Sequence, residues 1–157
     1  MLSLAVQFIL GLLYANAGEW LIHKYILHGL GRNRDSFWAF HWYEHHAVCT
    51  KNAMFDPGYR FVTLSWNAQT KELLVVLGAV LLHIPLFILF PFFTGAVYLS
   101  SILYCYKHRK AHLNPAWAKR HLRWHYDHHM DNCSANWCVT WPWFDYLMGT
   151  RVKNNTK

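Results

Sequence analysis

Two long segments of the chain, residues 2–22 and 72–106, are strongly apolar and contain no Lys or Arg. As a helix, the first segment is about 31 Å long, which matches the roughly 30 Å hydrocarbon core of a bilayer. Pro and Gly interrupt the second segment at 91–95, which predicts a helical hairpin with arms over 73–90 and 95–106. We therefore expect an all-α integral membrane protein with about three apolar helices, namely an N-terminal span and a hairpin.

All fifteen Lys and Arg residues lie in 23–71 and 107–157. Because a hairpin leaves the membrane on the side where it entered, both basic segments are expected on one face. Cytoplasmic segments of membrane proteins carry such a cationic excess, which predicts a cytoplasmic cap in a bacterial inner membrane or the endoplasmic reticulum. The length predicts one domain, 1–157. A signal peptide is disfavoured because no positive residue precedes the first apolar segment. No recognised nucleic-acid motif accompanies the positive charge, so a nucleic-acid partner is not expected.

Ten of the twelve histidines fall into four short boxes, all on the predicted cytoplasmic side. The boxes are His23-x4-His28, His41-x3-His45-His46, His108-x3-His112 and His125-x2-His128-His129. Neutral imidazole is a common ligand of transition metals. Because one ion takes about four to six donors, ten imidazoles suit two ions. We therefore expect the boxes to form a helical, histidine-rich cap that holds a dinuclear metal centre against the membrane.

Most boxes have the spacing that aligns ligands on an α-helix, because residues three or four apart share one face. This holds within the second, third and fourth boxes. In contrast, His23 and His28 are five residues apart, which suits a straight α-helix poorly. We expect the following Gly29-x-Gly31 sequence to unwind the helix end and bring His28 round to the site.

Ligating imidazoles usually donate their second N–H to a carboxylate or a carbonyl. Glu19, one turn before the first box, and Asp127, inside the last box, are the predicted acceptors. His121 is predicted to share a helix face with His125 and to support the ligands without binding metal. His83, in the hairpin, is interpreted as an ordinary buried histidine. The four cysteines lack C-x2-C spacing and are interpreted as packing or incidental residues. No catalytic residue is predicted beyond the metal ligands.

The boxes, in this order, resemble those of the fatty acid hydroxylase and sterol desaturase superfamily of membrane di-iron enzymes. The resemblance runs from Glu19 to Arg151 and begins with Glu-Trp-Leu-Ile-His-Lys-Tyr-Ile-Leu-His at 19–28. The segment Trp-Phe-Asp-Tyr-Leu-Met-Gly-Thr at 143–150 is similar to the closing signature of the family. The second box has three residues before its histidine pair, where close relatives usually have two. The first box also resembles that of the small bacterial carotenoid hydroxylases.

This resemblance implies a di-iron oxygenase that hydroxylates, or desaturates, an unactivated C–H bond of a lipid such as a fatty acyl chain or a sterol. It implies two Fe ions, O2 and a separate electron-donor protein of the cytochrome or ferredoxin type. A carotenoid hydroxylase is one alternative. A non-redox zinc-binding membrane protein is another, because imidazole accepts both metals and isolated protein can carry zinc. A metal transporter is disfavoured, because the apolar segments hold one histidine and no Lys, Arg or Asp.

Overall fold

The structure is a computed structural model that describes residues 3–61 and 65–153, and these residues form helices and turns without a β-strand. The all-α prediction is therefore confirmed for them. The helices are α1 (Leu4–Leu21), α2 (Ala47–Lys51), α3 (Ala68–Leu82), α4 (Ile84–Leu89), α5 (Pro91–Leu113), α6 (Pro115–His121), α7 (Arg123–Met130) and α8 (Trp143–Leu147), with π-helices at Ile22–Leu27 and His41–His46 and short 3-10 helices at Leu30–Arg32 and Pro57–Arg60. The ends of the predicted domain 1–157 lie outside the described residues, and the single domain stays a prediction.

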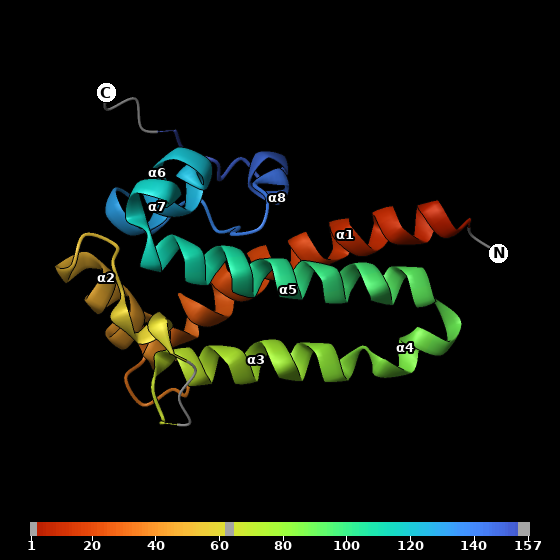
Figure 1. Cartoon of the computed structure of the whole chain (residues 1–157), viewed down its shortest axis with the longest axis horizontal. Helices are drawn as coiled ribbons and strands as arrows, with labels where there is room; N and C mark the ends of the chain where they lie inside the picture. The colour runs from red at the N-terminus through yellow and green to blue at the C-terminus, as the bar shows by residue number, and fades with distance from the viewer. Residues whose placement is uncertain (1–2, 62–64, 154–157) are drawn as a thin grey trace.

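The long helices α1, α3 and α5 run along the length of the molecule, α2, α6 and α7 gather at the left end in this view, and α8 lies above α5 (Figure 1). α1 and α5 pack against each other closely at Gly11. A β-carbon at this position would lie 2.8 Å from Ala96 Cβ and 2.4 Å from the Phe93 carbonyl oxygen. Only glycine permits this approach of the two backbones.

Within the described residues, one helical stretch, Leu4–Arg32, is long and apolar enough to cross a membrane. It corresponds to the predicted N-terminal apolar helix. The hairpin arms are not detected as spans by the same measure of length and composition. The predicted arm 73–90 is divided at His83 into α3 and α4, because Pro85 lies in the first turn of α4 and lacks the N–H that a continuous helix needs.

The chain reverses at Phe90, and Pro91 is the first residue of α5. Proline suits this position because its fixed φ is helical and the N–H that it lacks would have no partner in the first turn. The predicted break at 91–95 therefore lies inside α5. This helix continues to Leu113 and is much longer than the predicted arm 95–106.

The C-terminal part of the histidine cap begins where α5 ends. The Asn114 side chain accepts a hydrogen bond from the Trp117 N–H at 3.0 Å and so caps α6, whose first residue is proline. A small apolar core of Met54, Leu122 and Val139 is almost completely buried. This core holds α6 and α7 against the C-terminal part of the chain and positions the histidines of α7.

Candidate metal centre

The ten box histidines converge from four segments and are all buried, with at most 7% of any of them exposed. Five of them, which we call cluster I, each place a ring nitrogen within 4.8 Å of the others: His23, His28, His41, His46 and His128. The other five, cluster II, are His45, His108, His112, His125 and His129, and they fall into two overlapping groups of the same compactness. One group joins His45 and Cys49 to His112 and His129, and the other joins His108 and His125 to the same two histidines. The clusters adjoin, because the His46 and His129 rings stack with centroids 4.3 Å apart.

Two π-helices explain how histidines five residues apart reach the same cluster. In the first, the His28 N–H donates to the His23 carbonyl at 2.9 Å, the hydrogen bond between residues i and i+5 that defines this helix. His41 and His46 begin and end the second π-helix, and both belong to cluster I. The predicted unwinding at Gly29-x-Gly31 is therefore corrected: His28 keeps helical backbone angles, and the wider π-turn aligns it with His23.

In cluster I, backbone carbonyls of the C-terminal segment 135–150, the closing segment, orient the rings. The His23 Nδ1–H donates to the Trp137 carbonyl at 2.5 Å, and the His128 Nδ1–H donates to the Ala135 carbonyl at 2.7 Å. The opposite nitrogen of His128 lies 3.1 Å from His28 Nε2 and 3.3 Å from His46 Nε2. These bonds direct the Nε2 atoms inward to a common point.

In cluster II, a carboxylate and a carbonyl orient two rings of α5. His108 Nδ1 lies 2.5 Å from Glu72 Oε1, and His112 Nδ1 donates to the Met54 carbonyl at 3.0 Å. Met54 has a φ of 73°, a left-handed conformation that is rare outside glycine. The Nε2 atoms of His108 and His112 are 3.1 Å apart, and His125 Nε2 lies 3.2 Å from the latter.

This donor set fits bound metal. A carbonyl or a carboxylate accepts a hydrogen bond, so His108 and His112 carry their proton on Nδ1. With both rings neutral, their Nε2 lone pairs face each other and repel unless a cation lies between them. The same reasoning applies to the inward nitrogens of His23 and His128. Each cluster therefore has the composition and geometry of a nitrogen-rich site for one transition-metal ion.

The protonation states of the cap histidines support the same interpretation. Burial lowers the pKa of His128 to about 4. Burial, together with neighbouring histidines, also lowers the pKa of His125 and of His129. These rings are therefore neutral near pH 7, which is the form of imidazole that binds a metal ion.

Two buried acids hold the closing segment. Glu19 Oε1 accepts hydrogen bonds from the Val139 and Thr140 N–H groups at 2.5 and 2.9 Å. Asp145 is fully buried and accepts from the Trp137 and Cys138 N–H groups, both at 2.9 Å. Glu19 thus supports His23 through the loop rather than by direct contact. Asp145 belongs to the closing signature noted in the sequence, and the structure gives it a positioning role.

Two predicted supporting residues lie away from the histidines. His121 is the last residue of α6, exposed and near the Trp117 ring, whereas His125 belongs to α7. The helix ends between them, so they do not share the predicted face. Asp127 is buried, but its Oδ1 accepts from Arg123 Nε at 2.5 Å, and its Oδ2 lies 3.7 Å from Arg151 Nη1. It therefore joins α7 to the chain's end and contacts arginines instead of an imidazole.

Three residues that contact the clusters, Glu72, Tyr59 and Cys49, were not predicted from the sequence. Glu72 contacts His108 and also accepts a hydrogen bond from the Tyr59 hydroxyl. The position of Glu72 in the sequence indicates such a role, because an isolated acid at the end of an apolar run needs a partner, as Glu19 does. Cys49 was interpreted as packing, but its Sγ lies 3.3 Å from His112 Nδ1, on the outer side of that ring.

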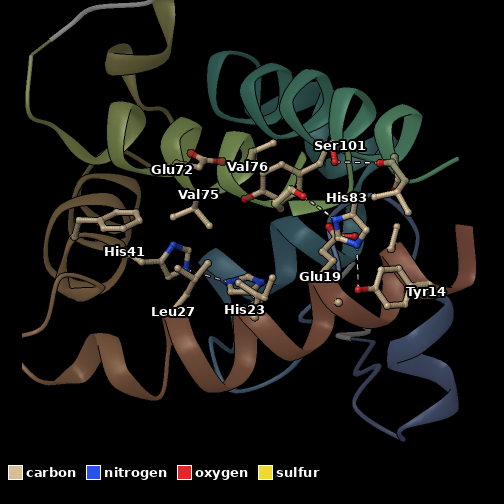
Figure 2. Close-up of a pocket in the computed structure, with 18 residues that line it drawn as sticks. Tyr14, Glu19, His23, Leu27, His41, Glu72, Val75, Val76, His83 and Ser101 are labelled. Carbon is tan, nitrogen blue, oxygen red and sulfur yellow. Dashed lines mark hydrogen bonds between the residues drawn. The ribbon is translucent and has the colours of Figure 1, made fainter. Parts of the chain in front are cut away.

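A cavity of about 180 Å³ adjoins the candidate metal centre on the side of the long helices. Figure 2 shows His23 and His41 of cluster I at one end of it. Its walls include the apolar side chains of Leu27, Val75 and Val76. No histidine of cluster II is among the described residues that line it, although Glu72 is. Cluster I therefore faces the cavity more directly than cluster II does.

The fold and the site define an all-helical protein in which two adjoining sets of five buried histidines lie beside an apolar cavity. A comparison with models of protein families matches the fatty acid hydroxylase family over residues 8–150, and the chain belongs to this family. It is therefore an oxidoreductase, as the sequence predicted. Membership implies a membrane-bound protein that oxidises a lipid with O2 at a di-iron centre. No curated protein and no solved structure matches the chain.

Proposed function

We propose that the chain is a membrane di-iron oxygenase that hydroxylates an unactivated C–H bond of a lipid. In the balanced reaction, R–H, O2, two electrons and two protons give R–OH and water. Removal of a second hydrogen in place of oxygen insertion would give an alkene. A separate donor protein of the cytochrome or ferredoxin type supplies the electrons. The observation that carries the proposal is the convergence of ten imidazoles beside an apolar cavity, in a chain of this family.

The ten box histidines are the proposed ligands, five for each ion. Bound iron supplies the O2 activation and electron transfer that side chains do not provide. The chain holds the ring orientations through the carbonyls of Trp137 and Ala135 and through the Glu72 carboxylate. Because hydrogen bonds of this kind fix both the tautomer and the direction of a ring, they keep the Nε2 atoms aimed inward.

The cavity is the proposed substrate site. Its apolar walls bind a hydrocarbon segment and exclude water, and the His23 and His41 end presents that segment to cluster I. We place α1 and the α3–α5 hairpin in the bilayer, with the histidine cap on the cytoplasmic face. Exposed apolar side chains such as Ile88, which is 85% exposed, support contact with lipid. A lipid would then enter the cavity from within the membrane.

Metal analysis and turnover test the proposal together. Protein purified without oxygen should contain two iron ions per chain and should convert lipid only with both O2 and a reductant. Lipid extracts of cells with the protein should contain a species heavier by one oxygen than those of cells without it. The variant His128→Ala should lose this product, whereas His121→Ala, which changes an exposed residue, should retain it. Product formed without O2 would contradict the proposal, and zinc-filled protein without oxidised lipid would favour the zinc-binding alternative.

A further inference from the structure

A polar pair lies at the end of the cavity opposite the histidines. Figure 2 shows Tyr14 and His83 there, joined by a hydrogen bond. The His83 Nε2 atom lies 3.1 Å from the Tyr14 hydroxyl, and its Nδ1 lies 2.7 Å from the Ala79 carbonyl. His83 is 7% exposed, although it belongs to the apolar part of the molecule. Polar groups in such surroundings are costly and often mark functional sites.

The proton positions in this pair follow from its partners. The Ala79 carbonyl only accepts, so His83 Nδ1 carries a proton and donates it. In the neutral ring, Nε2 then has a lone pair and accepts the Tyr14 hydroxyl proton. The tyrosine oxygen has no other proton to donate and keeps free lone pairs. The pair therefore presents a hydrogen-bond acceptor at this end of the cavity.

Two other polar residues along the cavity, Ser101 and Glu19, have partners within the protein. The Ser101 hydroxyl donates to the Val97 carbonyl at 3.0 Å. The oxygens of Glu19 accept hydrogen bonds from Val139, Thr140 and Asn16. Glu19 is thus occupied in holding the fold. The Ser101 oxygen has donated its only proton and, like the Tyr14 oxygen, keeps lone pairs. Tyr14, however, lies at the end of the cavity opposite His23 and His41, so its oxygen is the acceptor farthest along the cavity from cluster I (Figure 2).

We propose that the substrate is an apolar molecule with a hydroxyl group at one end, which donates a hydrogen bond to the Tyr14 oxygen while the other end reaches His23 and His41. This inference rests on the proposed oxygenase function. Tyr14 and His23 are nine residues apart on the helical stretch Leu4–Arg32, which corresponds to about 13 Å along the axis. The anchored hydroxyl therefore sets the distance to the carbon that is oxidised. Esters, ethers and ketones lack the proton that this site requires.

A series of saturated primary alcohols of increasing chain length, supplied to metal-loaded protein in lipid nanodiscs, tests the distance. The new oxygen should appear at a fixed number of carbons from the original hydroxyl in every product, as measured by the fragmentation of the product diols. The matched methyl ethers should give little product or none with a fixed position. Oxidation at a position counted from the methyl end, or scattered along the chain, would overturn the inference.

Binding tests the anchor without turnover, by displacement of a radiolabelled alcohol from the same nanodiscs. Tyr14→Phe should weaken the binding of the alcohol about three- to tenfold, the usual value of one hydrogen bond, and should leave the methyl ether unaffected. His83→Phe frees the Tyr14 proton and should shift the preference toward the ether. Tyr98→Phe, a tyrosine of α5 outside the cavity lining, is the matched control.

These two measurements separate the inference from the function on which it rests. Preferred binding of alcohols that depends on Tyr14, without any oxidised product, would retain the anchor and contradict the oxygenase. Oxidised product from alcohols and ethers alike, with equal binding in Tyr14→Phe, would contradict the anchor and retain the oxygenase. In that case the Tyr14 hydroxyl serves only as a hydrogen-bond partner for the buried His83.

Discussion

The two histidine clusters have the same number of imidazoles but are oriented by different neighbours. In cluster I, His23 and His128 donate to backbone carbonyls of the closing segment. In cluster II, His108 faces the Glu72 carboxylate. A carboxylate makes an imidazole a stronger donor than a neutral carbonyl does. Cluster II is therefore expected to hold its ion more tightly, whereas cluster I depends on the fold of the segment beside it.

The clusters also differ in their access to the cavity. Two histidines of cluster I, His23 and His41, line the cavity. From the surroundings of cluster II, the cavity is lined by Glu72, which contacts His108. The more weakly supported cluster therefore lies nearer the proposed substrate. This difference suggests separate tests of each cluster, in which a change on one side leaves the other intact.

The largest effect is expected from removal of one proposed ligand in each cluster. His128→Ala and His112→Ala should each abolish turnover, because both ions are required for the reaction. Metal content should fall from two ions per chain to one in each variant, as measured by elemental analysis. The control His121→Ala should keep both ions. Loss of both ions from either variant would show that the clusters do not fill independently.

A smaller effect is expected when the carboxylate of cluster II is neutralised. Glu72→Gln should lower metal affinity or activity about 10- to 100-fold, the usual cost of losing an acceptor behind a ligating histidine. The matched control is Glu44→Gln, which changes a more exposed acid that pairs with Lys71 at 2.6 Å. Competition with a chelator measures the affinity. An equal response of the two variants would contradict the special role of Glu72.

The closing segment provides the corresponding test for cluster I. Asp145→Asn replaces a buried carboxylate that accepts from two backbone N–H groups and from the Thr150 hydroxyl at 2.7 Å. The free energy of unfolding should fall by about 2 kcal/mol, because hydrogen bonds to a charged group are lost. Thermal unfolding in detergent measures this loss, and cluster I should release its ion first. Asp131→Asn, at an exposed position, should change neither quantity.

The smallest expected effect is a loss of stability of the metal-free protein at acidic pH. The pKa of His128 is lowered from 6.5 to about 4 by burial, so the unfolded chain binds the extra proton more readily than the folded one. The stability of metal-free protein should therefore decrease as the pH falls from 6.5 to about 4. At pH 5.5 this histidine alone should contribute a loss of about 1 kcal/mol. Chemical unfolding at several pH values measures the loss, and His128→Gln should reduce its pH dependence.

The sequence predicted the helical class, the apolar N-terminal helix and the family, because each depends on residue identity and on patterns within a short stretch. It predicted the hairpin less well. Pro85 divides the expected arm, and Pro91 begins a helix where the sequence was expected to break one. A proline marks a boundary in either case, but the side of the boundary on which the turn lies depends on packing against α1.

The candidate metal ligands could be recognised from residue order alone, because four boxes of imidazoles beside apolar runs have few other uses. Their division into two clusters of five histidines, with His45 and His46 in different clusters, became visible only in the folded chain. The fold also shows that Glu72 supports His108 and that Asp127 does not support a histidine. The type of ligand is a property of one side chain and can be read from its identity. A metal site, in contrast, requires atoms from distant segments to meet within a few ångströms, which packing alone controls.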